Sequence, residues 1–278
     1  MHKNILLFTS ILMMIGCQED GEIPAYLELT DFELVTEIGE GSNSHKITDA
    51  WVFVNGNSIG AYQLPSTVPV IGEGSTKLDI FPVIKENGVL AHSIMYPFYK
   101  KMTGDYDLIP GEVINLELTT QYEEGLEFII EDFDGTHFFT EDIDGNPSTK
   151  IEITSDDAFE GNSGLIVLNE GQEVLEAGWE MAFAPERAEQ AFIEINYKTN
   201  IPFVVGLIGI KNGAQSKWYE AIINVSEEWN KIYFNVTDII EPSVFDVVSP
   251  VIVGVWSDDI GVDEAVIRID NFKLIREK

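Results

Sequence analysis

The chain has 278 residues, of which 48 are Asp or Glu and 16 are Lys or Arg, so its formal net charge is −32 at pH 7. Such a charge repels nucleic acid and anionic lipid head groups, which excludes both as general partners. Hydrophobic residues make up 45% of the sequence, and the acidic residues are spread along it, which excludes general disorder.

The first sixteen residues have the pattern of a secretory signal peptide. Lys3 precedes a mostly apolar run from Ile5 to Ile15, which is far shorter than the roughly 20 residues that span a bilayer. Gly16 and Cys17 follow, and Cys17 is the only cysteine in the chain. A lone cysteine in a secreted protein needs an explanation other than disulfide pairing.

The junction Met14-Ile15-Gly16-Cys17 resembles the lipobox of bacterial lipoproteins, although Met14 stands where leucine is usual. This resemblance implies that residues 1–16 are removed and that Cys17 carries a covalent diacylglycerol and acyl chain. The alternative is an ordinary signal peptide beside an incidental cysteine.

Residues 17–22 form a short acidic tether. It resembles the export tags that some bacteria with two membranes place after a lipidated cysteine. We therefore expect a protein anchored by lipid in the outer membrane and facing the cell surface. The alternative is a solvated linker in a chain that is acidic throughout.

Residues 23–122 are predicted to form a small β-sandwich. Ala50–Val54 and Ser58–Tyr62 are strand patterns on either side of Asn55-Gly56, a pair that favours a hairpin turn. Further alternating patterns follow at 77–81 and 113–118. The segment from Ile47 to Pro82 is similar to small sandwiches of the carboxypeptidase-regulatory or PEGA kind.

Residues 126–278, after a short acidic joint, have short apolar runs separated by turn residues, which is typical of a second sandwich. The order of the motifs EDFDG, EGNSGL, WNKI and IDNFKL resembles the jelly rolls of carbohydrate-binding modules and galactose-binding-like domains. The predicted fold class is therefore all-β, a small N-terminal sandwich followed by a C-terminal jelly roll.

The jelly-roll resemblance also implies a structural calcium ion near the place where the first and last strands meet. Matched position by position, it implies Asp132 or Glu131, Glu160 and Asp270 as ligands. Carboxylates and turn carbonyls are the oxygen ligands that calcium prefers. The alternative is that these are ordinary members of a large set of acidic residues.

Alternation in Val251–Trp256 places Val251, Val253 and Val255 on one face of a strand and Trp256 on the other. If the valines face the core, Trp256 faces outward, where its flat ring could stack on a sugar.

Trp218 alternates with Tyr219, and Trp179 follows a glycine, so both are further candidates for the same concave ligand-binding face. The alternative is that these tryptophans, like most, are buried in the core or at its rim.

No catalytic motif stands out, and if Cys17 is acylated the chain has no free thiol, so we predict a non-catalytic binding protein. The first hypothesis is an accessory subunit of an outer-membrane protein assembly, whose partner is a membrane protein such as a β-barrel. The second is capture of an extracellular glycan by the C-terminal jelly roll.

Overall fold

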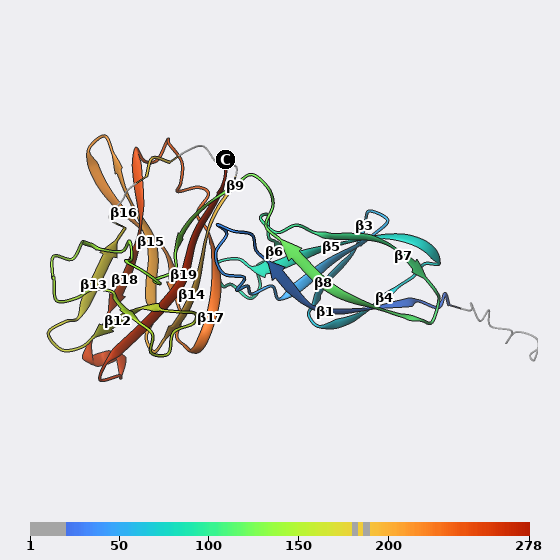
Figure 1. Cartoon of the computed structure of the whole chain (residues 1–278), viewed down its shortest axis with the longest axis horizontal. Coiled ribbons are helices and arrows are strands. Elements are labelled where there is room, and N and C mark those ends of the chain that lie inside the picture. The colour runs from blue at the N-terminus through green and yellow to red at the C-terminus, as the bar shows by residue number, and fades with distance from the viewer. Residues whose placement is uncertain (1–20, 180–182, 186–189) are drawn as a thin grey trace, which may run out of the picture.

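The structure is a computed structural model that describes residues 21–179, 183–185 and 190–278. The secondary structure in these ranges consists of β-strands and one short 3-10 helix, Asp258–Ile260, and contains no α-helix. No helix in them is long and apolar enough to cross a membrane. Two β-sandwiches lie side by side along the longest axis of the molecule (Figure 1), which confirms the predicted all-β fold class.

The first sandwich is built from eight strands in the described chain. They are β1 (Ala25–Val35), β2 (Asp49–Val54), β3 (Asn57–Gln63), β4 (Ser66–Val70), β5 (Gly74–Lys85), β6 (Ser93–Met95), β7 (Met102–Leu108) and β8 (Val113–Gln121). One sheet has the order β4-β1-β8, and the other has the order β3-β2-β5-β6, with β7 also paired to β5. The predicted hairpin joins β2 to β3, where Asn55 and Gly56 have φ of 51° and 79°.

The second sandwich contains the remaining strands of the described chain. They are β9 (Leu126–Glu131), β10 (Glu141–Asp142), β11 (Glu152–Thr154), β12 (Ser163–Leu168), β13 (Val174–Gly178), β14 (Ala191–Thr199), β15 (Phe203–Lys211), β16 (Ala214–Ile223), β17 (Ser226–Asn235), β18 (Val247–Val255) and β19 (Ala265–Glu277). The β18 sheet has the order β10-β13-β18-β15-β16. The β14 sheet has the order β11-β12-β19-β14-β17, with β9 paired to β19.

Strand β14 is buried on both of its faces. Ile193 and Ile195 of β14 face the core of the second sandwich, whereas Phe192 packs in the core of the first. Glu194, on the same face as Phe192, is also fully buried. The segment that follows β6 of the first sandwich helps to cover this face, since its Tyr96 packs against Phe192 and donates a hydrogen bond to Glu194. The two sandwiches therefore share a packed interface.

Val251 and Val253 of β18 point away from the core of the second sandwich, although they were expected to face it. Ile252 and Trp256 lie in the core of the second sandwich, whereas Val251 and Val253 belong to a small apolar cluster on the outer face, against which Ile143 packs. The premise that the valines face the core is wrong. Because both faces of β18 carry apolar side chains, their alternation identifies two faces without saying which one is inside.

Candidate functional site

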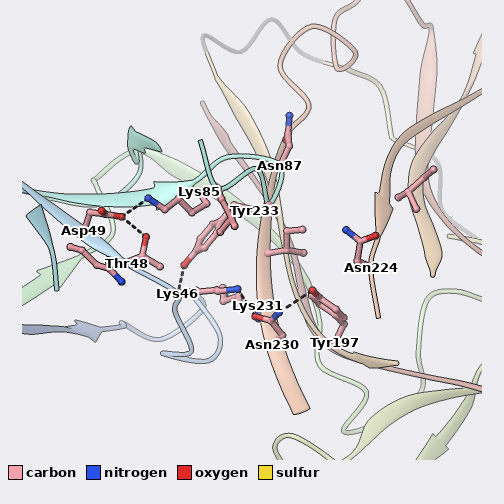
Figure 2. A pocket seen from close by; sticks show the side chains of 15 residues that line it. Lys46, Thr48, Asp49, Lys85, Asn87, Tyr197, Asn224, Asn230, Lys231 and Tyr233 are labelled. Carbon is pink, nitrogen blue, oxygen red and sulfur yellow. Dashed lines mark hydrogen bonds and ion pairs between the residues drawn. The ribbon is translucent and has the colours of Figure 1, made fainter. Parts of the chain in front are cut away.

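A cleft of about 420 Å³ lies between the two sandwiches. The start of β2 and the turn after β5 form one wall, and residues of β14, of β17 and of the end of β16 and its turn form the other. Figure 2 shows polar side chains reaching this cleft from both sides. Its volume falls within the range of about 300–1,000 Å³ that is typical of small-molecule sites.

The first sandwich contributes a charged wall that is held in place by internal contacts. Asp49 accepts hydrogen bonds from Lys85 Nζ at 2.7 Å and from Thr48 Oγ1 at 2.6 Å. Lys85 also donates to Ser93 Oγ at 2.6 Å. Lys85 therefore balances the charge of the Asp49 carboxylate, and the two contacts fix its orientation before any ligand binds.

The second sandwich contributes amide and hydroxyl groups. Asn230 donates from Nδ2 to the hydroxyl of Tyr197 at 3.0 Å, and its Oδ1 accepts a hydrogen bond from Lys46 Nζ at 2.6 Å. The side-chain amides of Asn224 and Gln63 line the same cleft, one from each sandwich, and make no hydrogen bond to the described part of the chain. Each amide presents a donor and an acceptor next to each other.

Two aliphatic side chains lie among these polar groups, one from each sandwich. Leu90 is 84% exposed and Ile222 is 71% exposed. The cleft therefore offers apolar contact surface beside its hydrogen-bonding groups.

Hydrogen bonds across the interface hold the two walls of the cleft at a fixed spacing. The Tyr233 hydroxyl accepts a hydrogen bond from the backbone N–H of Lys46 at 2.8 Å. The backbone N–H of Asn87 donates to the carbonyl of Tyr233, also at 2.8 Å. The cleft is thus formed in advance of binding, which reduces the ordering cost that a ligand would otherwise meet.

A buried ionic cluster lies beneath the cleft and includes two of its lining residues, Lys231 and Tyr233. Glu194 is at its centre: Lys231 Nζ lies 2.8 Å from Oε2, and the hydroxyls of Tyr96 and Tyr122 donate to the carboxylate at 2.8 and 3.1 Å. The ion pair itself lies within the second sandwich, whereas Tyr96 belongs to the first, so the docked first sandwich supplies hydrogen bonds that the buried carboxylate needs.

The pKa values in this cluster follow from burial and from neighbouring charge. Burial alone would raise the pKa of Glu194, but Lys231 and Lys273 hold it below its ordinary value. Burial, with the charge of Lys231, lowers the pKa of Lys273 to about 7. Burial and the Glu194 carboxylate raise the pKa of Tyr96 well above its ordinary value, so its hydroxyl stays protonated and acts as a donor.

The three tryptophans expected on a ligand-binding face are not brought together. Trp179 is 3% exposed and lies parallel to the ring of Phe139, with centroids 5.5 Å apart. Trp256 is 7% exposed and donates from Nε1 to the carbonyl of Val262 at 2.9 Å. The expectation that Trp179 and Trp256 face outward is therefore wrong, and neither ring face is open to a sugar.

Trp218 is 49% exposed and lies on β16, at an edge of the β18 sheet. It does not line the cleft. A single exposed ring does not make the predicted concave platform.

The four predicted calcium ligands use their oxygens to accept hydrogen bonds from the chain itself. Glu131 accepts the N–H groups of two residues of the loop that follows it, both at 2.7 Å, and Asp132 accepts that of Asp134 at 3.1 Å. Asp270 accepts from Ser163 Oγ at 2.7 Å.

Asp270 also accepts the backbone N–H of Glu160 at 3.2 Å, and the Glu160 carboxylate accepts a hydrogen bond from Ser42 Oγ at 2.9 Å. In the described ranges no group of three or more His, Cys, Asp or Glu side chains is placed to hold a metal ion. The arrangement does not fit the predicted calcium site.

The predicted lipidation residue, Cys17, and most of the acidic tether lie outside the described residues. Lipidation at Cys17 stays a prediction of the sequence.

The cleft residues were not singled out from the sequence. The two walls of the cleft come from segments that are far apart in the sequence; Lys46 and Asn230, for example, are separated by 184 positions. No short motif records such a meeting. The sequence held a partial signal in β14, where Glu194 and Asn196 alternate with the core residues Ile193 and Ile195. The face that carries the two polar residues would be open to solvent in an isolated sandwich.

No family model matches this chain, and no curated protein matches it. Among solved structures, a family 29 carbohydrate-binding module with a single substitution is 16% identical and has a TM-score of 0.33, covering 55% of this chain and 91% of the module. The family 30 module of a cellulosomal cellulase of Clostridium thermocellum is 12% identical, with a TM-score of 0.34, covering 52% of this chain and 90% of the module.

A CBM4 structure is also 12% identical, with a TM-score of 0.33, and covers 54% of this chain and 87% of its own. These values are too low to carry an argument about ligand or activity.

Proposed function

We propose that this protein binds a saccharide in the cleft between its two sandwiches and does not turn it over. The observation that carries the proposal is the composition of the cleft. Amides of Asn224, Gln63 and Asn230 meet there with the exposed aliphatic side chains of Leu90 and Ile222.

Sugars present pairs of neighbouring hydroxyls, each of which both donates and accepts hydrogen bonds. A side-chain amide offers the complementary pair of groups in one plane. Sugars also present C–H faces, which Leu90 and Ile222 can contact at the cleft. The cleft therefore matches both surfaces of a pyranose.

The first experiment is a binding assay on an array of extracellular oligosaccharides, followed by calorimetric titration of the saccharides that bind. Asn224→Ala is expected to weaken binding about tenfold, since it removes hydrogen bonds to the ligand worth about 0.5–1.5 kcal/mol each without breaking a side-chain hydrogen bond within the described chain.

The matched control is Asn212→Ala, an exposed amide on the turn between β15 and β16 that does not line the cleft. It should leave affinity unchanged. Binding to no saccharide, or equal loss in both variants, would overturn the proposal. Analysis of the bound saccharide after long incubation should recover it intact.

We further propose that the protein works outside the cell, held in the outer membrane by an acylated Cys17 and facing the surface. This part of the proposal rests on the signal sequence and on the lone cysteine. Cells fed a radiolabelled fatty acid should label the wild-type chain and should not label the Cys17→Ser variant. Protease added to intact cells should then remove the protein.

A second candidate function is docking on a protein partner, such as an outer-membrane β-barrel. The observation that favours it is the edge of the β18 sheet, where Trp218 on the edge strand β16 is 49% exposed. Exposed edge strands and apolar patches favour association with other chains. A photo-reactive amino acid in place of Trp218 should then cross-link one membrane protein in intact cells, and recovery of the chain alone would dismiss this candidate.

A further inference from the structure

The charged residues of the cleft do not balance, although most of them are paired. Lys85 is paired with Asp49 at 2.7 Å, and Lys231 is paired with Glu194 at 2.8 Å. Lys46 is the remaining charged residue of the lining, and its Nζ contacts only the neutral amide oxygen of Asn230 at 2.6 Å among the described residues. The cleft therefore has one positive charge in excess.

This excess runs against the character of the chain as a whole. Acidic residues outnumber basic ones three to one, yet the lining includes three lysines and a single acid, Asp49. Charges farther away than the Debye length of about 8 Å are largely screened at physiological ionic strength, so most of the acidic surface of the chain acts on a ligand in the cleft less than the lysines that line it.

We propose that the cleft selects an acidic saccharide, one that carries a carboxylate or a sulfate, and that Lys46 provides the counter-charge. This inference rests on the proposed saccharide function and names its ligand class. Asn230 holds the Lys46 ammonium group at the cleft, and the same amide is fixed by the Tyr197 hydroxyl at 3.0 Å. An ammonium group has three donors, so Lys46 can bind an anion while it keeps its contact with Asn230.

The test uses the full chain on an array in which each acidic saccharide is printed beside its uncharged counterpart. Uronic-acid oligomers are paired with their methyl esters, and sulfated oligomers are paired with their desulfated forms. The acidic member of a pair should bind about tenfold more tightly, since hydrogen bonds to charged groups are stronger than hydrogen bonds between neutral groups. The two kinds of pair separate carboxylate from sulfate recognition.

Lys46→Ala should remove this preference while the affinity for the uncharged member stays within about twofold. Lys46→Arg should retain it. The control is Lys77→Ala, an exposed lysine of β5 that does not line the cleft, and it should leave the preference unchanged. Raising the salt from 50 to 500 mM should weaken only the acidic member.

Equal binding of both members of every pair, or a preference that survives in Lys46→Ala, would overturn the inference and leave the saccharide function standing. Binding to no member of any pair would overturn both. Preference for the acidic member, lost only when residue 46 is uncharged, would establish it.

Discussion

The interface between the sandwiches depends on the buried carboxylate of Glu194, and its removal should be costly. The Glu194→Ala substitution would leave Lys231, whose side chain is 2% exposed, without its partner at 2.8 Å. It would also leave the hydroxyls of Tyr96 and Tyr122 without the carboxylate that accepts their hydrogen bonds.

Breaking a buried ion pair by removing one partner typically costs about 3–5 kcal/mol. A folded protein is stable by only about 5–15 kcal/mol, so this loss is a large fraction of the total. We expect Glu194→Ala to lower the free energy of unfolding by about 4 kcal/mol, measured by urea denaturation followed through tryptophan fluorescence.

Two further variants make the measurement decisive. Glu152→Ala removes an exposed carboxylate that lies 3.1 Å from Lys150 and should cost less than about 1 kcal/mol. The double variant Glu194→Leu with Lys231→Met removes both charges and should recover at least half of the loss. A cost below about 1 kcal/mol for Glu194→Ala, or no recovery in the double variant, would refute the reasoning.

The remaining predictions concern the core, the pH dependence of stability and the predicted metal. Trp179→Ala should lower the free energy of unfolding by about 3–5 kcal/mol, since its ring is buried among aromatic side chains. Trp218→Ala, at an exposed position, should change it by less than about 1 kcal/mol. Urea denaturation of both variants tests this, and equal costs would contradict the assigned positions. Burial raises the pKa of Asp270 to about 6 from its ordinary 3.8, so between these values the folded state binds more protons than the unfolded state. The stability contributed by this group is therefore fully present below about pH 4 and lost as the pH rises to about 6. The free energy of unfolding of the wild type relative to Asp270→Asn should fall across that window. A difference that stays constant with pH would be inconsistent with the raised pKa. Excess EDTA should leave the melting temperature unchanged, because Glu131 and Asp270 already accept hydrogen bonds from the chain itself, and a drop on chelation that calcium reverses would show that they bind a metal.

The sequence predicted the strand content and the hairpin at Asn55-Gly56, because alternation and turn residues are local properties of the chain. It failed at β18, where both faces carry apolar side chains and alternation could not tell which one is inside. As a result, Trp256 was predicted to be exposed, whereas in the structure it is buried in the core.

The candidate site was beyond the reach of local patterns for a different reason. Lys46 and Asn230 belong to different sandwiches, and each is an ordinary polar residue near a strand end when read alone. Glu194 and Phe192 were closer to being recognisable, because a charged and an aromatic residue share the outer face of one strand. Only the docking of the first sandwich onto that face shows why both are buried.

The central claim is that a saccharide binds between the two sandwiches, and photoaffinity labelling tests it most directly. A saccharide selected on the array is fitted with a diazirine, irradiated with the full chain, and the labelled peptides are identified by mass spectrometry. We predict labels in residues 46–49, 85–90 and 222–233, and their loss when unmodified saccharide is added in excess. Labels confined to the outer face of the β18 sheet, or to the strands of the first sandwich far from the cleft, would contradict the account.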